Sequence, residues 1–326
     1  MRLRALLPCT GAPWYRWRMM GETYAGAMAT EDLESRMRQL VADQAQRVEA
    51  EMASIIEHAC KAASMRESAT YAALGGGKRL RPALTLLCAQ ACGEDGNAAL
   101  PAAAAIEFVH AFSLVHDDLP CMDDDDLRRG RPTLHVHAGE AAALLSGDAM
   151  LNAAYWTLAH RVPGRELTAR LTLELADASA RMIDGQTLDT LGGFEASMGD
   201  QADRLRLIHE WKTGALMRAA CRMGAISARA GDDELSAVTR YAEAVGLMFQ
   251  IVDDLIDVEQ STEQAGKRTG KDAKAGKLTF PGILGIDASR AEVSRLLGDS
   301  LAAVAVLGER GDDLADLARV LASRTR

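Results

Sequence analysis

The sequence predicts an all-α protein with one large domain, and three observations support this prediction. Alanine, leucine and methionine dominate the chain, whereas aromatic residues make up only 4% of it. Apolar residues recur at three- and four-residue steps over long stretches, as in amphipathic helices. No segment rich in valine, isoleucine and threonine alternates with polar residues, as an exposed strand would. Hydrophobic residues make up 48% of the chain, enough for a sizeable core, which we place in residues 31–326.

Residues 1–30 differ from the rest of the chain. Four arginines and three aromatic residues occur around or before the first acid, Glu22: Arg2, Arg4, Arg16, Arg18, Trp14, Tyr15 and Trp17. A transit peptide has a similar composition, but Pro8 and Pro13 break the amphipathic helix that it would need. We expect a disordered extension produced by an upstream start codon, with Met28 as the alternative start.

The first helices are expected in the N-terminal third of the chain. Apolar positions at helical spacing predict a long first helix that begins near residue 33 and ends near residue 59. Three glycines at 75–77 break the pattern, which resumes over 80–91. A turn at 93–96 precedes the nearly all-apolar segment 98–119. This segment should be a buried helix.

The remaining helices are predicted from the same periodicity. Four stretches are expected at 139–160, 166–190, 203–230 and 234–258. The segment 259–280 is polar and rich in lysine and glycine, which makes it the candidate for a mobile lid. Pro281 begins a new helical segment, and 288–324 should contain two more helices.

Charge and cysteine content exclude several classes of function. The net charge of −9 argues against a nucleic-acid-binding surface. The six cysteines show no C-x-x-C spacing, so they are expected to be reduced, in a cytoplasmic protein without a zinc site. No apolar stretch reaches the length of a transmembrane helix before a charge interrupts it.

Two acidic clusters are the most informative feature of the chain. The first is Asp117-Asp118-x-x-x-x-Asp123 and the second is Asp253-Asp254-x-x-Asp257, each at or near the end of an apolar run. Carboxylates this close repel one another and stay ionised when cations lie between them. Hard oxygen ligands select magnesium or calcium, and magnesium completes its shell with water and substrate phosphate. The clusters therefore predict a magnesium–diphosphate site between two helices.

The second cluster has the spacing of a helix. Asp253 and Asp257 are four residues apart, so both carboxylates lie on one helical face. Asp254 points about 100° away and should support the other two. A solvated acidic face is the alternative, but the large apolar neighbours of these acids disfavour it.

The first cluster needs a bend in the chain. Asp117 and Asp123 are six residues apart, which an unbroken helix does not align. Pro120 should disrupt the last turn and bring Asp123 back toward Asp117. An exposed acidic loop after a core helix is the alternative interpretation.

Basic residues occur where several phosphates would need neutralising. They are Lys78, Arg79 and Arg81 after the glycine loop, Arg128 and Arg129 after the first cluster, Lys212 inside an apolar helix, and Lys267, Lys271 and Lys277 in the lid candidate. A glycine loop that opens into a helix can hold a phosphate on its backbone amides. Each lysine taken singly also fits a solvated surface. His110 and His116 on the buried helix fit satisfied core residues equally well.

Together these motifs resemble those of the trans-polyprenyl diphosphate synthases, most of all the bacterial farnesyl diphosphate synthases. The resemblance extends from about residue 33 to the C-terminus. It rests on G-G-G-K-R-L-R-P at 75–82, H-D-D-L-P-C-M-D-D-D-D-L-R-R-G at 116–130, K-T-G at 212–214, F-Q-I-V-D-D-L-I-D at 249–257 and G-K-x-x-G-K-D at 266–272. It implies a bundle of about ten helices around a central cavity, usually in a homodimer.

The resemblance also assigns roles to residues. Isopentenyl diphosphate would be bound by Lys78, Arg81, His110 and Arg129. The allylic diphosphate would be held by Arg128, Lys212, Thr213, Gln250, Lys267 and Lys277. About three magnesium ions would be bound by Asp117, Asp123 and Asp253, with Asp118 and Asp257 assisting through water. Catalysis would depend on Asp117, Asp123, Arg128, Lys212, Asp253 and Lys267.

The implied reaction is ionisation of the allylic diphosphate, attack by the double bond of isopentenyl diphosphate, and loss of a proton. The aromatic Phe112, beside the smaller Ser113, resembles the cavity floor of enzymes that make the fifteen-carbon farnesyl product. A geranylgeranyl diphosphate synthase is the alternative, and an inactive regulatory subunit is a more remote one. A class I terpene cyclase would need a different second metal motif. The family's G-M-V-G-G-Q is replaced here by R-M-I-D-G-Q at 181–186, which affects the inference about chain length.

Overall fold

The computed structural model describes residues 14–263 and 278–324, and it confirms the all-α prediction. The only strands in this described part are β1 (Leu127–Arg128) and β2 (Arg131–Pro132), which form a minimal antiparallel hairpin. The sequence analysis expected no strand, and two residues per strand are too few for a periodic pattern. Within the same ranges, no helix is long and apolar enough to cross a membrane.

The N-terminal half contains most of the predicted helices close to their expected bounds. They are α1 (Trp14–Ala59), α2 (Ala63–Ala73), α3 (Leu80–Ala91), α4 (Leu100–Asp117), α5 (Leu134–Ala138), α6 (Glu140–Arg161) and α7 (Arg165–Leu191). Since α1 begins at Trp14, it includes part of the N-terminal segment. The expected division at residue 30 stays a prediction.

The C-terminal half differs from the prediction in two places. Its elements are η1 (Ala196–Met198), α8 (Gln201–Ile208), η2 (His209–Gly214), α9 (Ala215–Ser227), α10 (Asp232–Glu263), α12 (Phe280–Leu284), α13 (Ile286–Val304), η3 (Ala305–Gly311) and α14 (Asp312–Ser323). The single helix expected at 203–230 is interrupted by η2, which is a π-helix. The helix expected to end at 258 continues to Glu263, so the lid candidate is shorter at its start, and its residues 264–277 lie outside the described part.

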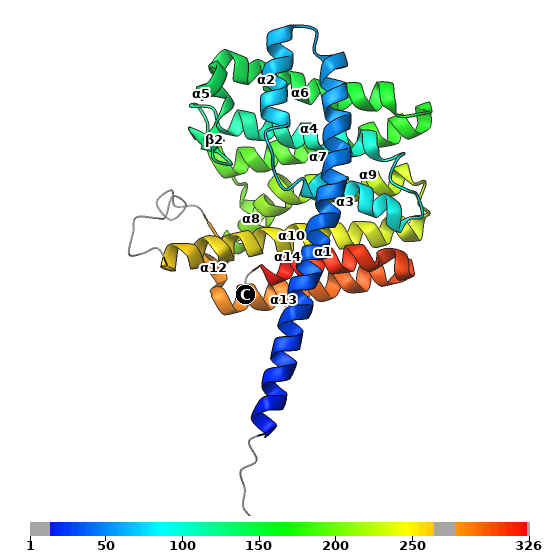
Figure 1. The fold of residues 1–326 in the computed structure, drawn as a ribbon. Coiled ribbons are helices and arrows are strands. Elements are labelled where there is room, and N and C mark those ends of the chain that lie inside the picture. Colours follow the sequence, from blue (N-terminus) through cyan, green and yellow to red (C-terminus); the bar gives the residue numbers. More distant parts are fainter. Residues whose placement is uncertain (1–13, 264–277, 325–326) are drawn as a thin grey trace, which may run out of the picture.

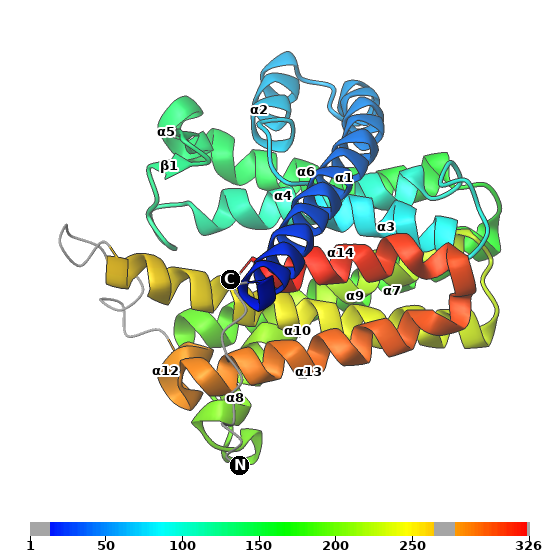
Figure 2. The ribbon, with the colours of Figure 1, turned by 60° about the horizontal axis from the view of Figure 1, so that its bottom comes forward.

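The helices are arranged on two sides of the molecule. In Figures 1 and 2, α2, α4, α5 and α6 lie together on one side, and α10, α13 and α14 lie together on the other. Helices α3 and α9 pack against each other between the two sides, while α1 crosses the front of the molecule. The closest neighbours of α4 and α10 are α6 and α13, respectively.

Two hydrophobic cores correspond to these two sides. One contains the apolar face of α4 together with residues of α1, α2, α6 and α7. The other contains α10 together with residues of α3, α9, α13 and α14. The alanine run Ala102–Ala105 is fully buried, because small side chains let α4 approach its neighbours closely. Each core therefore holds one of the two helices that carry an acidic cluster.

Candidate active site

The first acidic cluster is folded back as predicted. Helix α4 ends at Asp117, and the backbone N–H of Asp123 donates a hydrogen bond to the carbonyl oxygen of Asp117 at 2.8 Å. Burial raises the pKa of the Asp117 carboxyl to about 6, the nearby Lys212 opposes this, and Asp123 adds to it. The six-residue spacing therefore brings the two acids together without a continuous helix.

Asp118 faces a different partner. Its carboxylate is 3% exposed and accepts hydrogen bonds from Nε of Arg128 at 2.7 and 2.9 Å. A further contact of 2.6 Å joins Arg128 Nη2 to the same carboxylate. This two-point pairing fixes the plane of the guanidinium at the start of the hairpin. Asp118 thus positions Arg128, and its participation in metal binding through water stays a prediction.

The glycine loop and the hairpin interlock. Arg129 has a left-handed backbone (φ 55°), and its guanidinium donates to the carbonyl oxygen of Gly76. The φ of 133° at Gly77 restricts this position to glycine, and a Cβ atom there would lie 2.5 Å from Nη1 of Arg129, which shows how closely the guanidinium packs on the loop. The loop therefore places Arg129 over the segment that leads to Lys78 and Arg81.

Arg79, between those two cations, is part of the framework. Its buried guanidinium donates to Glu107 at 2.7 Å, to Glu49 at 2.8 Å and to the carbonyl oxygen of Ala73 at 2.6 Å. These bonds tie the glycine loop to α1, α2 and α4. The sequence analysis missed Glu107, although an isolated acid in an otherwise apolar helix is itself a signal, because a buried carboxylate needs a cation.

Arg81 and His110 form a desolvated pair. Arg81 Nη1 lies 3.3 Å from His110 Nε2, and Arg81 Nε is buried without a hydrogen-bond partner among the described residues. Burial lowers the pKa of Arg81, and burial together with nearby arginines holds the pKa of His110 well below 6.5. His110 is therefore neutral and accepts from Arg81 at Nε2. A cation with unsatisfied donors is prepared for an anionic ligand.

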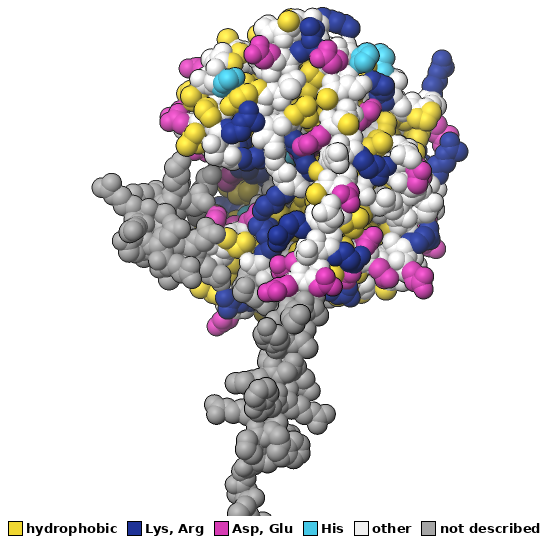
Figure 3. Space-filling view, viewed as in Figure 1, with side chains coloured by type: hydrophobic (Ala, Val, Ile, Leu, Met, Phe, Trp, Pro, Cys, Tyr) yellow, Lys and Arg dark blue, Asp and Glu magenta, His cyan; other side chains and the backbone are white. Residues whose placement is uncertain are grey.

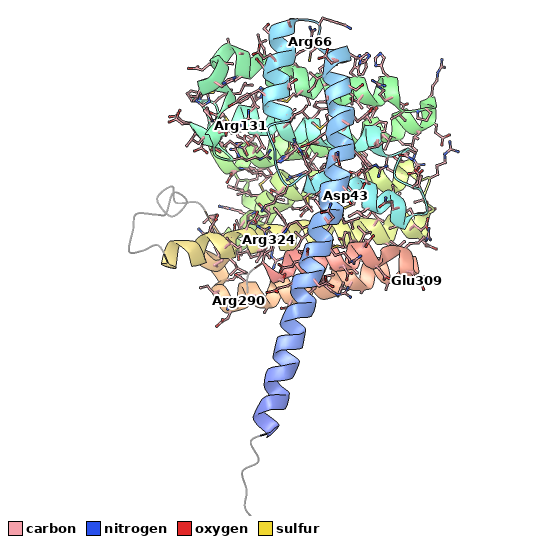
Figure 4. All side chains as sticks on the ribbon, viewed as in Figure 1. Asp43, Arg66, Arg131, Arg290, Glu309 and Arg324 are labelled. Atoms are coloured by element: carbon pink, nitrogen blue, oxygen red, sulfur yellow. The ribbon has the colours of Figure 1, made fainter. Side chains whose placement is uncertain are left out.

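The second acidic cluster lies near the C-terminus of the chain. Asp253 Oδ1 is 3.4 Å from Nη1 of Arg324, which is labelled near the middle of Figure 4. Burial raises the pKa of Asp253, and Arg324 and then Lys78 oppose this. Asp257 is exposed one turn further along α10. Arg324 was missed in the sequence analysis because no local pattern relates a C-terminal arginine to residue 253.

Asp254 supports the neighbouring elements, in line with its predicted direction. Its Oδ2 accepts a hydrogen bond of 2.9 Å from the backbone N–H of Phe280 at the start of α12. The same oxygen is 3.4 Å from Nε2 of His209, whose ring stacks on Phe280. Asp254 therefore holds α12 and η2 against α10 directly behind Asp253.

The π-helix η2 presents the K-T-G motif. Lys212 Nζ pairs with Asp189 Oδ2 at 2.6 Å, and the Thr213 hydroxyl donates to Gln250 Oε1 at 3.2 Å. Lys212 also acts electrostatically on Asp117, so α4, α7, η2 and α10 meet here. The extra residue in a π-turn shifts the side chains relative to an α-helix, which explains how a polar motif interrupts this apolar segment.

Other predicted residues are placed less directly. Lys267 and Lys277 lie outside the described residues. Phe112 is 6% exposed and meets the His116 ring edge-on, at 5.7 Å between ring centroids. The Ser113 hydroxyl donates to the carbonyl oxygen of His110 at 3.0 Å. The chain-length role of Phe112 and Ser113 stays a prediction.

A small cavity of about 60 Å³ opens beside these groups. It is lined by residues of α2, the glycine loop, α4 and the hairpin, including His110, Asp118, Arg128 and Arg129. Lys and Arg side chains gather near the middle of one face of the molecule, around a hollow (Figure 3). A larger recess of about 1270 Å³ between α7, α9, α10 and α13 is lined by none of the predicted site residues.

The donor set suits magnesium. In the part of the chain that the structure describes, no group of three or more His, Cys, Asp or Glu side chains is close enough to hold a metal ion. Magnesium uses one or two carboxylates per ion and takes its other ligands from water and phosphate, so a dense cluster is not required. Asp117, Asp123 and Asp253 would each supply hard oxygen ligands for such ions.

Comparison with known proteins identifies similar sequences and folds. The family model described as Polyprenyl synthetase matches residues 62–308. The farnesyl diphosphate synthase of Escherichia coli (strain K12) is 44% identical over 259 residues, which cover 77% of this chain and 85% of that protein. Geranylgeranyl pyrophosphate synthase 7, chloroplastic, of Arabidopsis thaliana is 41% identical over 239 residues, covering 72% and 69%.

Solved structures give the same result. An FPP/GFPP synthase from Zymomonas mobilis aligns with a TM-score of 0.75 at 33% identity, over 90% of this chain and 100% of that one. A geranyltransferase from Legionella pneumophila aligns with a TM-score of 0.77 at 30% identity, over 90% and 99%. Relatives named for products of different length are thus about equally similar to this chain.

Proposed function

The chain belongs to the polyprenyl synthetase family, and we propose that it extends an allylic diphosphate with isopentenyl diphosphate to give farnesyl diphosphate. The fold is accordingly the all-α bundle of isoprenoid synthases, and the activity class is that of a short-chain trans-prenyltransferase. One observation supports the proposal above the others. Two acidic clusters on helices of separate cores are accompanied by cations that face them: Lys212 and Arg128 at Asp117, and Lys78 and Arg81 at Asp253.

The roles of the side chains follow from charge. Magnesium, when bound at Asp117, Asp123 and Asp253, would draw negative charge onto the leaving diphosphate. Arg128 and Lys212, which act electrostatically on Asp117, would stabilise the charge that develops on this group. When the allylic carbon–oxygen bond breaks, the double bond of isopentenyl diphosphate attacks the positively charged allylic carbon. The condensed product then loses a proton to the released diphosphate. No side-chain nucleophile is needed.

Isopentenyl diphosphate fits the second set of cations. Arg81 and Arg129 lie near the neutral His110, which can accept from Arg81 or donate to a phosphate through its other nitrogen. The buried, unpartnered Nε of Arg81 gains a partner when an anion binds, which makes binding at this position favourable. The framework contacts of Arg79 hold the loop in place before the substrate arrives.

The fifteen-carbon product is proposed from the bulk of Phe112. A buried aromatic side chain on α4, more than one turn before Asp117, would limit the length of a chain that grows along this helix. The 44% identity to a farnesyl diphosphate synthase agrees with this assignment. Geranylgeranyl diphosphate is the second candidate, because plant synthases named for that product are 40–42% identical.

Product analysis tests the proposal. The purified chain is incubated with dimethylallyl and isopentenyl diphosphates and magnesium, and the products are dephosphorylated and separated by length. We expect mainly farnesol, and no product after chelation of the metal. Mainly twenty-carbon product would replace farnesyl by geranylgeranyl diphosphate as the assignment. No product from the isolated chain would contradict the enzymatic proposal and support a regulatory subunit.

A further inference from the structure

Tyr71 connects the hairpin to helix α2. Its hydroxyl donates a hydrogen bond of 2.8 Å to the carbonyl oxygen of Pro132, in strand β2. The guanidinium carbon of Arg131 lies over the tyrosine ring, 4.2 Å from its centroid. His137 of α5 stacks on the same ring at 3.9 Å between centroids and 5° between planes. The Tyr71 side chain thus contacts both strand β2 and the helix that follows it, α5.

The arginines of the hairpin fit against two glycines of the loop that follows α2. A Cβ atom at Gly75 would lie 2.8 Å from Nη1 of Arg131, and one at Gly77 would lie 2.5 Å from Nη1 of Arg129. Arg131 and Arg129 therefore dock on the same glycine loop two residues apart, and Tyr71 lies one turn before that loop. Figure 4 labels Arg131 in the upper half of the molecule, beside this loop.

The hairpin that carries Arg129 is very short and needs such a restraint from outside. Arg129 is exposed as a whole residue, but partial burial of its guanidinium lowers its pKa; Arg79 lowers it further, and Glu107 opposes this. Arg131, on the second strand, is also exposed. Each strand of the hairpin has only two residues. A two-stranded hairpin of this length is not stable alone. Without an anchor, the hairpin alone would not hold Arg129 in a fixed position on the loop.

We propose that Tyr71 is a positioning residue that, by holding Arg131 and Pro132, fixes where Arg129 is presented to isopentenyl diphosphate. The inference rests on the proposed assignment of Arg129 to that substrate. Tyr71, Gly75, Arg129 and Arg131 all line the small cavity beside His110, so a shift of the tyrosine ring changes the wall of the binding site directly. The residues proposed for the allylic diphosphate include Lys212, which lies on η2 and pairs with Asp189 of α7, away from the hairpin.

Steady-state kinetics with each substrate varied in turn test this role. We expect Tyr71→Leu to raise the KM for isopentenyl diphosphate about ten-fold, because one cation–aromatic contact and one stacked ring are lost. The KM for the allylic diphosphate should stay within about two-fold of the wild-type value. The Tm should stay within about 2 °C of the wild type, since the tyrosine is only half-buried. Tyr71→Phe keeps both ring contacts and should retain most of the affinity.

Three further variants make the result decisive. Tyr155→Leu, the same change on α6, should leave both KM values unaltered. Arg131→Ala should reproduce the effect of Tyr71→Leu, and the double variant should be no worse than either single one, because both remove the same contact. Arg129→Gln should raise the same KM on its own.

The outcomes separate the two ideas. If Arg129→Gln raises the KM for isopentenyl diphosphate while Tyr71→Leu leaves it unchanged, the positioning role is wrong and the assignment of Arg129 stands. If Arg129→Gln changes neither KM, the assignment and the inference fall together. Equal rises in both KM values with Tyr71→Leu, or a loss with Tyr71→Phe as large as with Tyr71→Leu, would also overturn the stacking role.

Discussion

His110 shows how a single buried side chain responds to the charges around it. Burial and the surrounding arginines, Arg81 first, hold its pKa well below 6.5. Below pH 6.5 the unfolded chain takes up a proton at this histidine that the folded protein does not. The free energy of unfolding should therefore fall as the pH is lowered from 6.5, by at most about 1.4 kcal/mol per pH unit for this group.

Chemical denaturation at pH 7.5 and 5.5 measures this effect. The wild type should lose more stability between these two pH values than His110→Gln, which removes the titrating ring. Asp117, with a pKa of about 6, acts in the opposite direction, since its folded form gains a proton as the pH falls. The comparison with the variant cancels this contribution. Equal pH dependence of the two proteins would show that His110 is not held neutral.

Phe112 carries the prediction about product length. Replacing it with alanine removes a buried aromatic ring from α4 and leaves space along the path of the growing chain. Phe112→Ala should shift the main product from fifteen to twenty carbons or more, measured by mass spectrometry of the dephosphorylated products. Ser113→Phe is the opposite change at the neighbouring position and should shorten the product. An unaltered product profile in both variants would exclude a floor at this level.

At the scale of elements, the contact between α7 and η2 is tight enough to test. A Cβ atom at Gly185 would overlap the backbone nitrogen of Lys212. Gly185→Ala should therefore displace η2, lower the free energy of unfolding by about 1–3 kcal/mol and reduce kcat, because Lys212 leaves its place beside Asp117. Gly298→Ala is the matched control, since its Cβ would meet no atom within 4 Å. Loss of kcat in the control to the same degree would contradict the explanation.

The elements also show what can be predicted from a sequence. Helices with a continuous apolar face, such as α4 and α10, were predicted because burial and helical period give the same pattern. The return of Asp123 to Asp117 was predicted because proline ends a helix for local reasons. The π-helix η2 and the hairpin were not predicted, since tertiary packing and not local periodicity determines them.

Site residues follow the same division. Acidic and basic residues in dense motifs could be assigned to the site from their spacing. The residues that form ion pairs with them and orient them could not. Asp118 was predicted to assist metal binding through water, which stays a prediction, and its pairing with Arg128, ten residues further along the chain, was missed. The contact of Arg324 with Asp253 joins residues that are distant in the chain. Such pairings depend on how helices cross, which a sequence pattern does not contain.

At the scale of the whole molecule, we propose a homodimer through α6 and α7. Five large apolar side chains on these two helices are about half exposed or more: Leu144 at 49%, Leu145 at 54%, Leu173 at 63%, Ile183 at 49% and Leu191 at 80%. Adjacent exposed leucines on long helices are typical of a surface that is covered in an assembly.

Light scattering measures the mass in solution. The wild type should have twice the chain mass of 34.9 kDa, and Leu144→Lys combined with Leu145→Lys should reduce it to one chain. Val306→Lys, at a position on η3 that is 64% exposed, should leave the dimer intact. A wild-type mass of one chain at micromolar concentration would exclude the dimer.

The central claim is that the two acidic clusters act together on one diphosphate. Calorimetric binding of a slowly ionising thio analogue of dimethylallyl diphosphate, with magnesium present, tests it most directly in Asp117→Asn, Asp253→Asn and the double variant. The account predicts that each single change weakens binding more than about ten-fold and that the double change is scarcely worse than one. Effects that multiply in the double variant, or binding unaffected by either change, would show that Asp117 and Asp253 serve separate sites.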